Sequence, residues 1–354
     1  MLVWKRKPIL RFMYHQERGW CLPVLTHSFP KLLDALAAPK LGYLEQHIGV
    51  YSGLRWKSKH TTIRAGTALI ALIEKHKVTL EDYKLDDDEE VIILKRPKAN
   101  GYDDQGGFEE YEDTPATRRM RDEVFALNSW LERSDIRFDP KVYPTIVDVR
   151  ARRLFRYFAN GRFDNGGRLF RGFWENLPKL VRLQGITIEG ERVVELDYGQ
   201  LNPTLAYYVA EAAPPPGDAY TLPGLAPYRD GVKRIFNAML FDERPRKRFP
   251  EGEKKRFPPK TKIGDVTGAI HDRHPRLASV LSTGVGFQLM FLESEIMMRV
   301  LERCRLKGIV ALPVFDALIV KVSAAREAKA VMIEQFKKKT GLEIEVKLEQ
   351  LEAS

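Results

Sequence analysis

Two aspartates in similar apolar, strand-like settings are the residues whose surroundings most strongly suggest chemistry. Asp197 lies near the end of the apolar run 193–198, and Asp316 lies within the apolar run 308–322. A carboxylate that leaves an apolar strand is costly to desolvate unless something pairs with it, and a divalent cation is a common partner where two such strands converge. The pair therefore predicts a two-metal nucleotidyl-transfer site, provided that the two strands meet.

The residues around each aspartate predict the elements that hold it. Apolar and polar residues alternate over 192–197, which predicts a strand with Asp197 facing a cleft. Asn202 is then expected to cap a helix that has Pro203 at its first position. β-Branched and apolar residues on both sides of Asp316 predict a hairpin with this aspartate at or near its tip.

Further elements are expected before and after these two sites. A helix over 324–339 and a strand over 342–347 complete an α+β unit in which helices back a sheet. Upstream, patterns of apolar residues predict helices over 114–133 and 145–158. The second of these carries arginines at 150, 152, 153 and 156, which either follow a phosphate backbone or form a solvated helix face.

Between the two aspartates, Arg229 and Lys233 stand four residues apart in a segment with helical spacing. A like-charge pair at this spacing is mildly unfavourable on a helix unless an anion lies over it. A triphosphate fits that description. Two solvated cations on a surface helix are the alternative.

Two further segments have the composition of nucleic-acid contacts. The glycine-rich stretch 160–174 interleaves aromatic residues with arginines, among them Arg168 and Arg171, which can stack on bases and bind phosphates. The alternative is a loop whose aromatic residues enter the core. The segment 243–262 is rich in cations, including Lys254 and Lys255, and poor in apolar residues, which predicts an exposed, mobile loop suited to nucleic acid.

The first 113 residues show no catalytic pattern. Helices are expected over 29–38 and 65–75 and a short strand over 91–94. An acidic run over 86–90 is typical of a solvated turn, and 100–107 is typical of a linker.

The bulk composition narrows the class of protein. The chain has 354 residues, a formal net charge of +10 and a pI near 9.4, which favours a polyanionic partner. No apolar run approaches the roughly 18 residues of a membrane span, and the N-terminus has no signal-peptide pattern, so we expect a cytoplasmic protein without a membrane partner. Two distant cysteines argue against a disulfide framework or a structural zinc site.

The order of the motifs resembles motifs A, B and C of the family A DNA polymerases and the related single-subunit phage-type RNA polymerases. The matching parts are Asp-Tyr-x-Gln-Leu at 197–201, Arg-x-x-x-Lys at 229–233 followed by an aromatic residue at 241, and the hairpin that carries Asp316. The resemblance covers roughly residue 161 to the C-terminus. It implies a right-hand architecture with a palm sheet backed by helices, helical fingers and a thumb-like region.

The resemblance also implies roles for individual residues. Asp197, Asp316 and the backbone carbonyl of Tyr198 would bind two Mg²⁺ ions, or Mn²⁺ in their place. Nucleotide contacts would come from Arg229, Lys233, Tyr198, Asn202 and Phe241, with Lys233 also catalytic, and Gln288 would face the primer-template duplex. The sequence departs from the family pattern at three positions. Phe315 stands where the family has histidine, and Asn202 stands where its DNA polymerases have a glutamate that excludes ribonucleotides. The glycine that usually follows the last aromatic residue of motif B is missing after Phe241.

The resemblance implies a division of the chain by function. The expected parts are an N-terminal accessory region (1–113), a helical thumb-like region (114–185), a palm (186–213 and 285–354) and fingers (214–284). Before Asp113, the spacing Asp-x-Glu occurs only inside the acidic run 86–90, and no Asp-x-Glu motif of the kind that a proofreading exonuclease carries is present.

The resulting prediction is a template-dependent nucleotidyltransferase, DNA polymerase-like and tolerant of ribonucleotides, acting on DNA and nucleoside triphosphates. An RNA polymerase or primase of the same superfamily, a catalytically silent nucleic-acid-binding relative and a metal-dependent nuclease are the alternatives.

Overall fold

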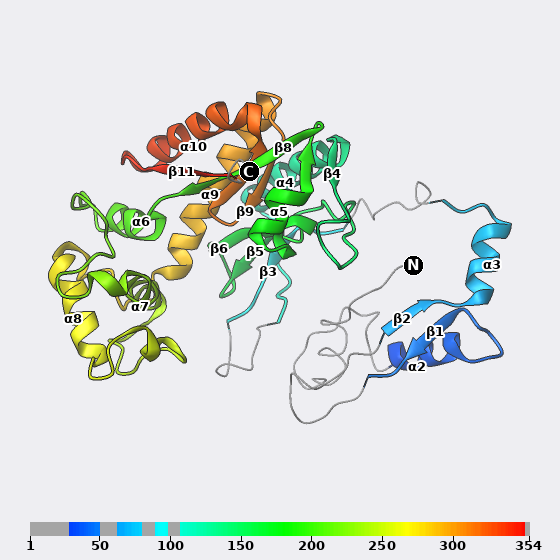
Figure 1. Ribbon diagram of the computed structural model, residues 1–354, viewed down its shortest axis with the longest axis horizontal. Helices are drawn as coiled ribbons and strands as arrows, with labels where there is room; N and C mark the ends of the chain where they lie inside the picture. The colour runs from blue at the N-terminus through cyan, green and yellow to red at the C-terminus, as the bar shows by residue number, and fades with distance from the viewer. Residues whose placement is uncertain (1–27, 50–61, 80–88, 98–106, 351–354) are drawn as a thin grey trace. The chain divides into compact units, whose positions relative to one another are not determined.

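The computed structural model describes residues 28–49, 62–79, 89–97 and 107–350, and it combines helices with strands throughout (Figure 1). The contacts divide the chain into two compact units, 1–90 with 97–108 (unit 1) and 91–96 with 109–354 (unit 2). The short strand near residue 92 therefore belongs with the rest of unit 2, and not with the N-terminal residues to which the sequence assigned it. Most of the predicted acidic turn and linker lies outside the described residues.

Unit 1 contains a small hairpin with two helices. Helices α2 (Ser28–Ala37) and α3 (Thr67–Lys75) agree with the two helices predicted there. Strands β1 (Leu44–His47) and β2 (Thr62–Ala65) pair antiparallel.

Unit 2 is built on two sheets. The larger sheet has the order β4-β7-β8-β10-β9, with β11 also paired to β8, and all of its pairs are antiparallel. Its strands are β4 (Ile136–Phe138), β7 (Ile186–Ile188), β8 (Glu191–Tyr198), β9 (Ala311–Val314), β10 (Ala317–Lys321) and β11 (Val346–Glu349). The smaller sheet has the order β3-β5-β6, with β3 (Ile92–Leu94) parallel to β5 (Phe155–Ala159) and β6 (Arg162–Phe170) antiparallel to it.

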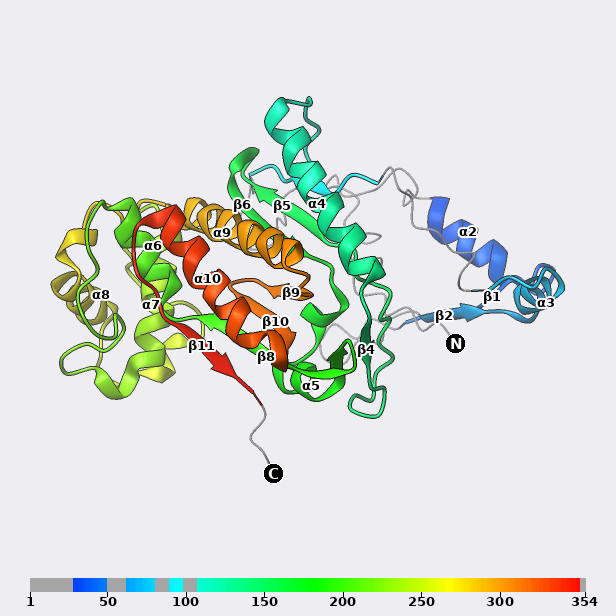
Figure 2. The ribbon, with the colours of Figure 1, turned by 90° about the horizontal axis from the view of Figure 1, so that it is seen from above.

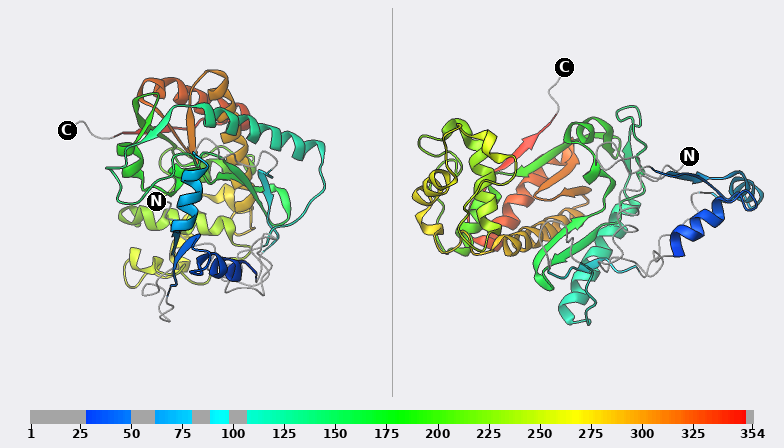
Figure 3. Two further views of the ribbon diagram at one scale, coloured as in Figure 1. Left: turned by 90° about the vertical axis from the view of Figure 1, so that its right-hand side faces the viewer. Right: turned by 90° about the horizontal axis from the view of Figure 1, so that it is seen from below.

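Helices cover these sheets and extend beyond them. The helices of unit 2 are α4 (Pro115–Arg133), α5 (Lys179–Gly185), α6 (Leu201–Val209), α7 (Arg229–Phe241), α8 (Ile263–Arg273), α9 (Gly286–Leu306) and α10 (Ala325–Thr340). Helices α9 and α10 lie side by side along the sheets (Figure 2), and α6, α7 and α8 gather at one end of unit 2 (Figures 1 and 3). None of the described helices is both long and apolar enough to cross a membrane.

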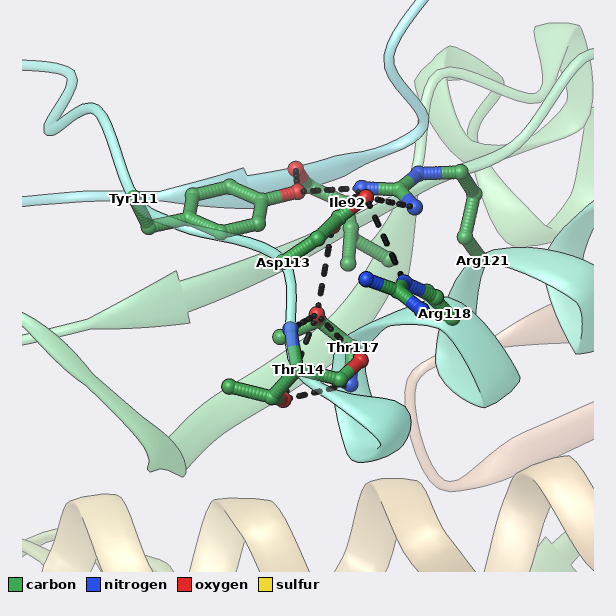
Figure 4. A network of polar contacts seen from close by, with 7 residues as sticks. All are labelled: Ile92, Tyr111, Asp113, Thr114, Thr117, Arg118 and Arg121. Atoms are coloured by element: carbon green, nitrogen blue, oxygen red, sulfur yellow. Dashed lines mark hydrogen bonds and ion pairs between the residues drawn. The ribbon is translucent and has the colours of Figure 1, made fainter.

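The first turn of α4 shows how sequence signals set a helix start. Thr114 and Thr117 form a reciprocal capping box, and Pro115 occupies the first helical position. Arg121 forms a two-pronged ion pair with Asp113 at 2.6 and 3.1 Å and also donates to the Tyr111 hydroxyl at 3.3 Å (Figure 4). These contacts attach the start of α4 to the segment that leads into it.

The helix predicted over 145–158 is wrong. Residues 145–154 have no regular structure, and 155–159 form β5. Arg152 donates to the backbone carbonyls of Ser134 and Ile136, both at 2.6 Å, and Arg156 is fully buried, so neither side chain follows a phosphate backbone. The helix was predicted because arginines that donate to backbone carbonyl groups happen to have the same spacing in the sequence as the polar face of a helix.

Four smaller differences from the predictions concern where segments begin and how ordered they are. The glycine-rich stretch forms a regular strand, β6, whose register shifts where Gly166 and Gly167 adopt positive φ angles. Helix α6 begins at Leu201, with Gln200 (φ 56°) in the capping position, so Asn202 is not the cap. Strand β11 lies two to four residues later than predicted. In the predicted mobile loop 243–262, Phe257 is 5% exposed and packs near Gly231 of α7, which anchors this segment.

Candidate active site

The register of the larger sheet brings the two aspartates together. Strand β8 pairs with β10 so that Asp197 lies opposite Ala317, the residue after Asp316. Strands β9 and β10 are joined by a two-residue turn, Phe315 and Asp316, so the hairpin with the aspartate at its tip agrees with the prediction. Backbone pairing, and not side-chain contact, therefore sets the distance between the two carboxylates.

The electrostatics of the pair reflect this closeness. Burial, followed by the charge of Asp316, raises the pKa of Asp197 to about 6. Burial also raises the pKa of Asp316, against the opposing effect of the cations of Arg168 and Lys233. The two carboxyl groups are thus a like-charged, partly desolvated pair.

This donor set fits a divalent cation. Two carboxyl groups that lie close together are difficult to ionise at the same time, and a cation between them stabilises both charges. Ligand sets made only of oxygen atoms suit Mg²⁺ or Mn²⁺. In the part of the chain that the structure describes, no group of three or more His, Cys, Asp or Glu side chains could hold a metal. Further ligands would therefore come from backbone carbonyls, substrate or water.

Glu195 does not share the open position of Asp197. Its side chain is buried, accepts hydrogen bonds from the Arg182 guanidinium at 2.7 and 3.2 Å, and lies 3.2 Å from Lys179 Nζ. Strand β8 lies in the centre of the sheet, and Val194 and Leu196 are buried as well. Simple alternation could not predict this because both faces of the strand are covered.

Tyr198 is oriented away from the pair. The side chain is 4% exposed, and its hydroxyl donates to the Met332 carbonyl of α10 at 2.8 Å. The predicted contact of the Tyr198 ring with a nucleotide is therefore wrong, because the ring is in the core. The predicted role of its backbone carbonyl as a metal ligand does not depend on the ring.

Arg168 is attached to both α9 and the hairpin tip. Its guanidinium donates two hydrogen bonds of 2.6 Å to Glu293, and it lies over the Phe315 ring at 5.2 Å from the ring centroid. Glu293 is 3% exposed, and burial raises the pKa of this carboxyl to about 7 in spite of Arg168. The two-pronged pair fixes one cation beside Asp316.

Arg229, at the start of α7, is held by the loop that precedes it. Its Nε donates to Asp218 Oδ2 at 2.6 Å, and its guanidinium lies over the buried Tyr220 ring at 5.3 Å. The backbone N–H between these two loop residues, that of Ala219, donates to Gln200 Oε1 at 2.5 Å. A chain of contacts thus runs from the turn after Asp197 to Arg229.

Lys233 lies one turn further along α7 and is exposed. It makes no hydrogen bond or ion pair with the residues that the structure describes, and its charge lowers the pKa of Asp316. The structure therefore places a solvated ammonium group within electrostatic reach of the hairpin tip.

The remaining predicted residues lie around this centre or on the surface. Asn202 Nδ2 donates to Asn237 Oδ1 of α7 at 3.1 Å, so it joins α6 to α7. Phe241 is 43% exposed and meets Phe287 edge to face at 5.3 Å. Gln288 is exposed in the first turn of α9.

The predicted basic contacts are also on the surface. Lys254 and Lys255 are exposed, and Lys254 lies over the Phe249 ring at 5.1 Å. Arg171 is exposed, with its guanidinium 4.1 Å from the centre of the Phe155 ring.

Sequence reasoning missed three residues that position others: Asp218, Asn237 and Glu293. Asp218 stands beside a glycine after a proline run and resembles an ordinary turn residue. Glu293 gave a weak signal, as an acidic residue in a largely apolar helical stretch. Their partners lie 11, 35 and 125 positions away in the chain, so no local pattern could identify them.

No family model and no curated protein matches the chain. One similar solved structure is the POL domain of Pol1 from M. smegmatis in complex with DNA primer-template and dNTP. The TM-score is 0.38 and the sequence identity 12%, over 78% of this chain and 59% of that chain. This chain thus spans less than two thirds of that structure.

Proposed function

We propose that this chain is a template-dependent nucleotidyltransferase that extends the 3′ end of a nucleic-acid strand. The observation that carries the proposal is the register that sets Asp197 beside the Asp316 turn, with the cations of Lys233 and Arg168 acting on the Asp316 carboxylate. Two convergent carboxylates beside phosphate-binding cations are the arrangement that phosphoryl transfer requires.

Each group of residues in the site has a separate role in the proposed reaction. Bound at Asp197, Asp316 and the Tyr198 carbonyl, two Mg²⁺ or Mn²⁺ ions would supply activation of the 3′-hydroxyl and neutralisation of the leaving pyrophosphate. Arg229 and Lys233 bind the triphosphate, and Lys233 stabilises the charge that develops on the phosphoryl oxygens and donates a proton to pyrophosphate. Base pairing with the template selects the nucleotide.

The proposal assigns parts of a polymerase to unit 2. Residues 186–213 and 285–354 form the palm, and 214–284 form the fingers. Gln288, Arg168, Arg171, Lys254 and Lys255 contact nucleic acid, and Phe241 contacts the nucleotide. The protein acts on DNA and nucleoside triphosphates in the cytoplasm.

Sugar selection is the part of the proposal that separates DNA synthesis from RNA synthesis or priming. Asn202 is neutral, and its contact with Asn237 places it between α6 and α7. We expect Asn202→Glu to lower the use of ribonucleotides relative to deoxynucleotides by about tenfold, because a longer, charged side chain disfavours the 2′-hydroxyl. The ratio of kcat/KM values for the two nucleotide sets measures this, and an unchanged ratio would show that Asn202 only joins the helices.

Primer extension tests the proposed function directly. The protein is incubated with a labelled primer on a longer template, Mg²⁺ and either four dNTPs or four rNTPs, with a primer-free reaction and Asp316→Ala as controls. Templated lengthening that the substitution abolishes supports the proposal, and the nucleotide set and the primer-free reaction distinguish DNA polymerase, RNA polymerase and primase. Bound but unextended DNA would indicate a silent binding protein, and shortening without nucleotides would indicate a nuclease.

A further inference from the structure

His274 is a fully buried imidazole that none of the roles assigned so far uses. It follows the last residue of α8, and its ring centroid lies 5.9 Å from that of Tyr207 of α6 and 5.5 Å from that of Phe236 of α7. Its Nδ1 is 2.9 Å from the Tyr207 hydroxyl, and its Nε2 is 2.8 Å from the Ala219 carbonyl oxygen. Both ring nitrogens therefore contact groups from other parts of the fold.

The two partners of His274 determine the form of its ring. A carbonyl oxygen only accepts hydrogen bonds, so Nε2–H donates to Ala219, and in the neutral ring Nδ1 accepts from the Tyr207 O–H. Burial lowers the pKa of His274 below its ordinary value, against the effect of the hydrogen bond to Ala219 and together with the charge of Arg273. The imidazole is thus neutral and has one tautomer.

The backbone of Ala219 is held from two sides by side chains that are distant in the sequence. Gln200 accepts from its N–H at 2.5 Å, and His274 donates to its carbonyl oxygen. Arg273 also donates to the Pro216 carbonyl at 2.8 Å. The end of α8 and the residue before α6 therefore fix the loop that Ala219 belongs to.

Ala219 lies between the two loop residues that hold Arg229. Asp218 accepts from Arg229 Nε at 2.6 Å, and the buried Tyr220 ring lies under the same guanidinium at 5.3 Å. Planar peptide bonds join Ala219 to both neighbours, so a shift of its backbone moves the carboxylate and the ring together. The orientation of Arg229 thus depends on the position of Ala219.

We propose that His274 is a positioning residue for triphosphate binding, which acts by holding the Ala219 carbonyl and thereby fixing the loop that orients Arg229. The inference rests on the proposed function for the assignment of Arg229 to the triphosphate. A loop that is already fixed in the free protein loses little conformational freedom when the ligand binds. His274 therefore acts on nucleotide affinity and not on the chemical step.

A matched pair of substitutions at His274 isolates the contact with Ala219. The amide of His274→Gln reaches the position of Nε2 and donates to the carbonyl, whereas the shorter side chain of His274→Asn reaches only the position of Nδ1. Both variants lose the ring, so they share the packing defect. We expect His274→Asn to raise KM for the nucleotide by about three- to tenfold with kcat within about twofold, and His274→Gln to stay within about twofold in both constants.

Two further variants separate this contact from its surroundings. Tyr207→Phe removes the hydrogen bond to Nδ1 and leaves the Ala219 contact in place, so KM should stay within about twofold. Gln200→Met removes the contact on the other side of Ala219 without altering the buried ring, and it should raise KM by about three- to tenfold.

A double substitution tests whether His274 acts through Arg229. In an Arg229→Met background, His274→Asn should change KM by less than about twofold, because the cation that it orients is absent. An effect of His274→Asn that persists in this background would overturn the proposal.

Hydrogen exchange of the backbone amides of 218–221, measured without nucleotide, tests the loop independently of catalysis. We expect faster exchange in His274→Asn and Gln200→Met, and rates near those of the natural chain in His274→Gln and Tyr207→Phe. Thermal unfolding of each variant identifies any loss of fold, and Gln200→Met decides the matter if His274→Asn does not fold.

The outcomes separate the role of His274 from the proposed function. Unchanged exchange in His274→Asn would overturn the role, and so would an equal rise of KM in His274→Asn and His274→Gln, which would trace the effect to the lost ring. If the natural chain extends no primer, the proposed function fails, and the exchange rates alone decide whether His274 fixes the loop.

Discussion

The candidate site has an acidic half (Asp197 and Asp316) and a basic half (Arg229 and Lys233), and the two are held in different ways. In the acidic half, backbone hydrogen bonds between β8 and β10 set the relative position of the carboxylates. In the basic half, the cations extend from a helix surface, Arg229 through its ion pair with Asp218 and Lys233 into solvent. A sheet register has few alternatives, whereas long side chains have many, so the acidic half is preorganised and the basic half is adjustable.

The largest effect is expected from substitution in the acidic half. Asp197→Asn and Asp316→Asn should each lower Mg²⁺-dependent extension by at least about a thousandfold, because the loss of a metal ligand removes several kcal/mol of transition-state stabilisation. Steady-state extension assays measure the loss. Nucleic-acid binding should be nearly unchanged, and thermal stability should not fall, since either substitution relieves repulsion between the two carboxylates. Extension that persists in one variant would remove that aspartate from the metal site.

Lys233 gives the next largest effect. Lys233→Met should lower kcat by about a hundredfold, because one charge-stabilising donor in the transition state is lost. Single-turnover extension measures the chemical step. Arg234→Met, on the next residue of α7 and ion-paired with Glu253 at 3.4 Å, is the matched control and should stay within about twofold. Equal losses in both variants would show a general effect of helix charge.

Asp218 tests how far the basic half depends on its support. Asp218→Asn should raise KM for the nucleotide by about three- to tenfold with little change in kcat, because Arg229 loses the anion that orients it. Initial rates over a range of nucleotide concentrations separate the two constants. Asp230→Asn is the control: this carboxyl is 82% exposed and 3.7 Å from the same guanidinium. A lower KM in Asp218→Asn would mean that Asp218 competes with the triphosphate.

The smallest effect is on stability, and it concerns a carboxyl that forms no ion pair with the residues that the structure describes. Glu175 Oε2 accepts from the Arg171 N–H at 3.1 Å, no donor among the described residues reaches its Oε1, and burial raises its pKa to about 7. The folded state therefore binds this proton more tightly than the unfolded state, and this contribution to stability is lost as the pH rises through about 7.

Glu175→Gln should remove that loss. We expect the variant to be more stable than the natural chain at pH 8 by about 1–2 kcal/mol, with the difference decreasing toward pH 5. Urea unfolding at several pH values measures it. A difference that does not change with pH would show that Glu175 is charged in the folded state throughout.

Predictability from sequence differs between the elements of the site for a physical reason. The hairpin at Asp316 was predictable because β-branched residues flank it on both sides, and helix α7 was predictable from its spacing. The orientation of Tyr198 and Glu195 was not, because their strand is covered on both faces and alternation then carries no information. Arg152 misled for a different reason, since its partners are carbonyl groups at the end of α4, about 20 positions away in the chain.

By itself, the sequence determined which residues are acidic, basic or aromatic, and it placed the strand of Asp197, the Asp316 hairpin and the cationic helix α7. Only the tertiary structure decided that β8 and β10 are neighbours, that Asp218 holds Arg229 and that Glu293 holds Arg168. The reason is that local patterns depend on backbone preferences over a few residues. The pairing of strands and the partners of long side chains depend on contacts between residues up to more than a hundred positions apart.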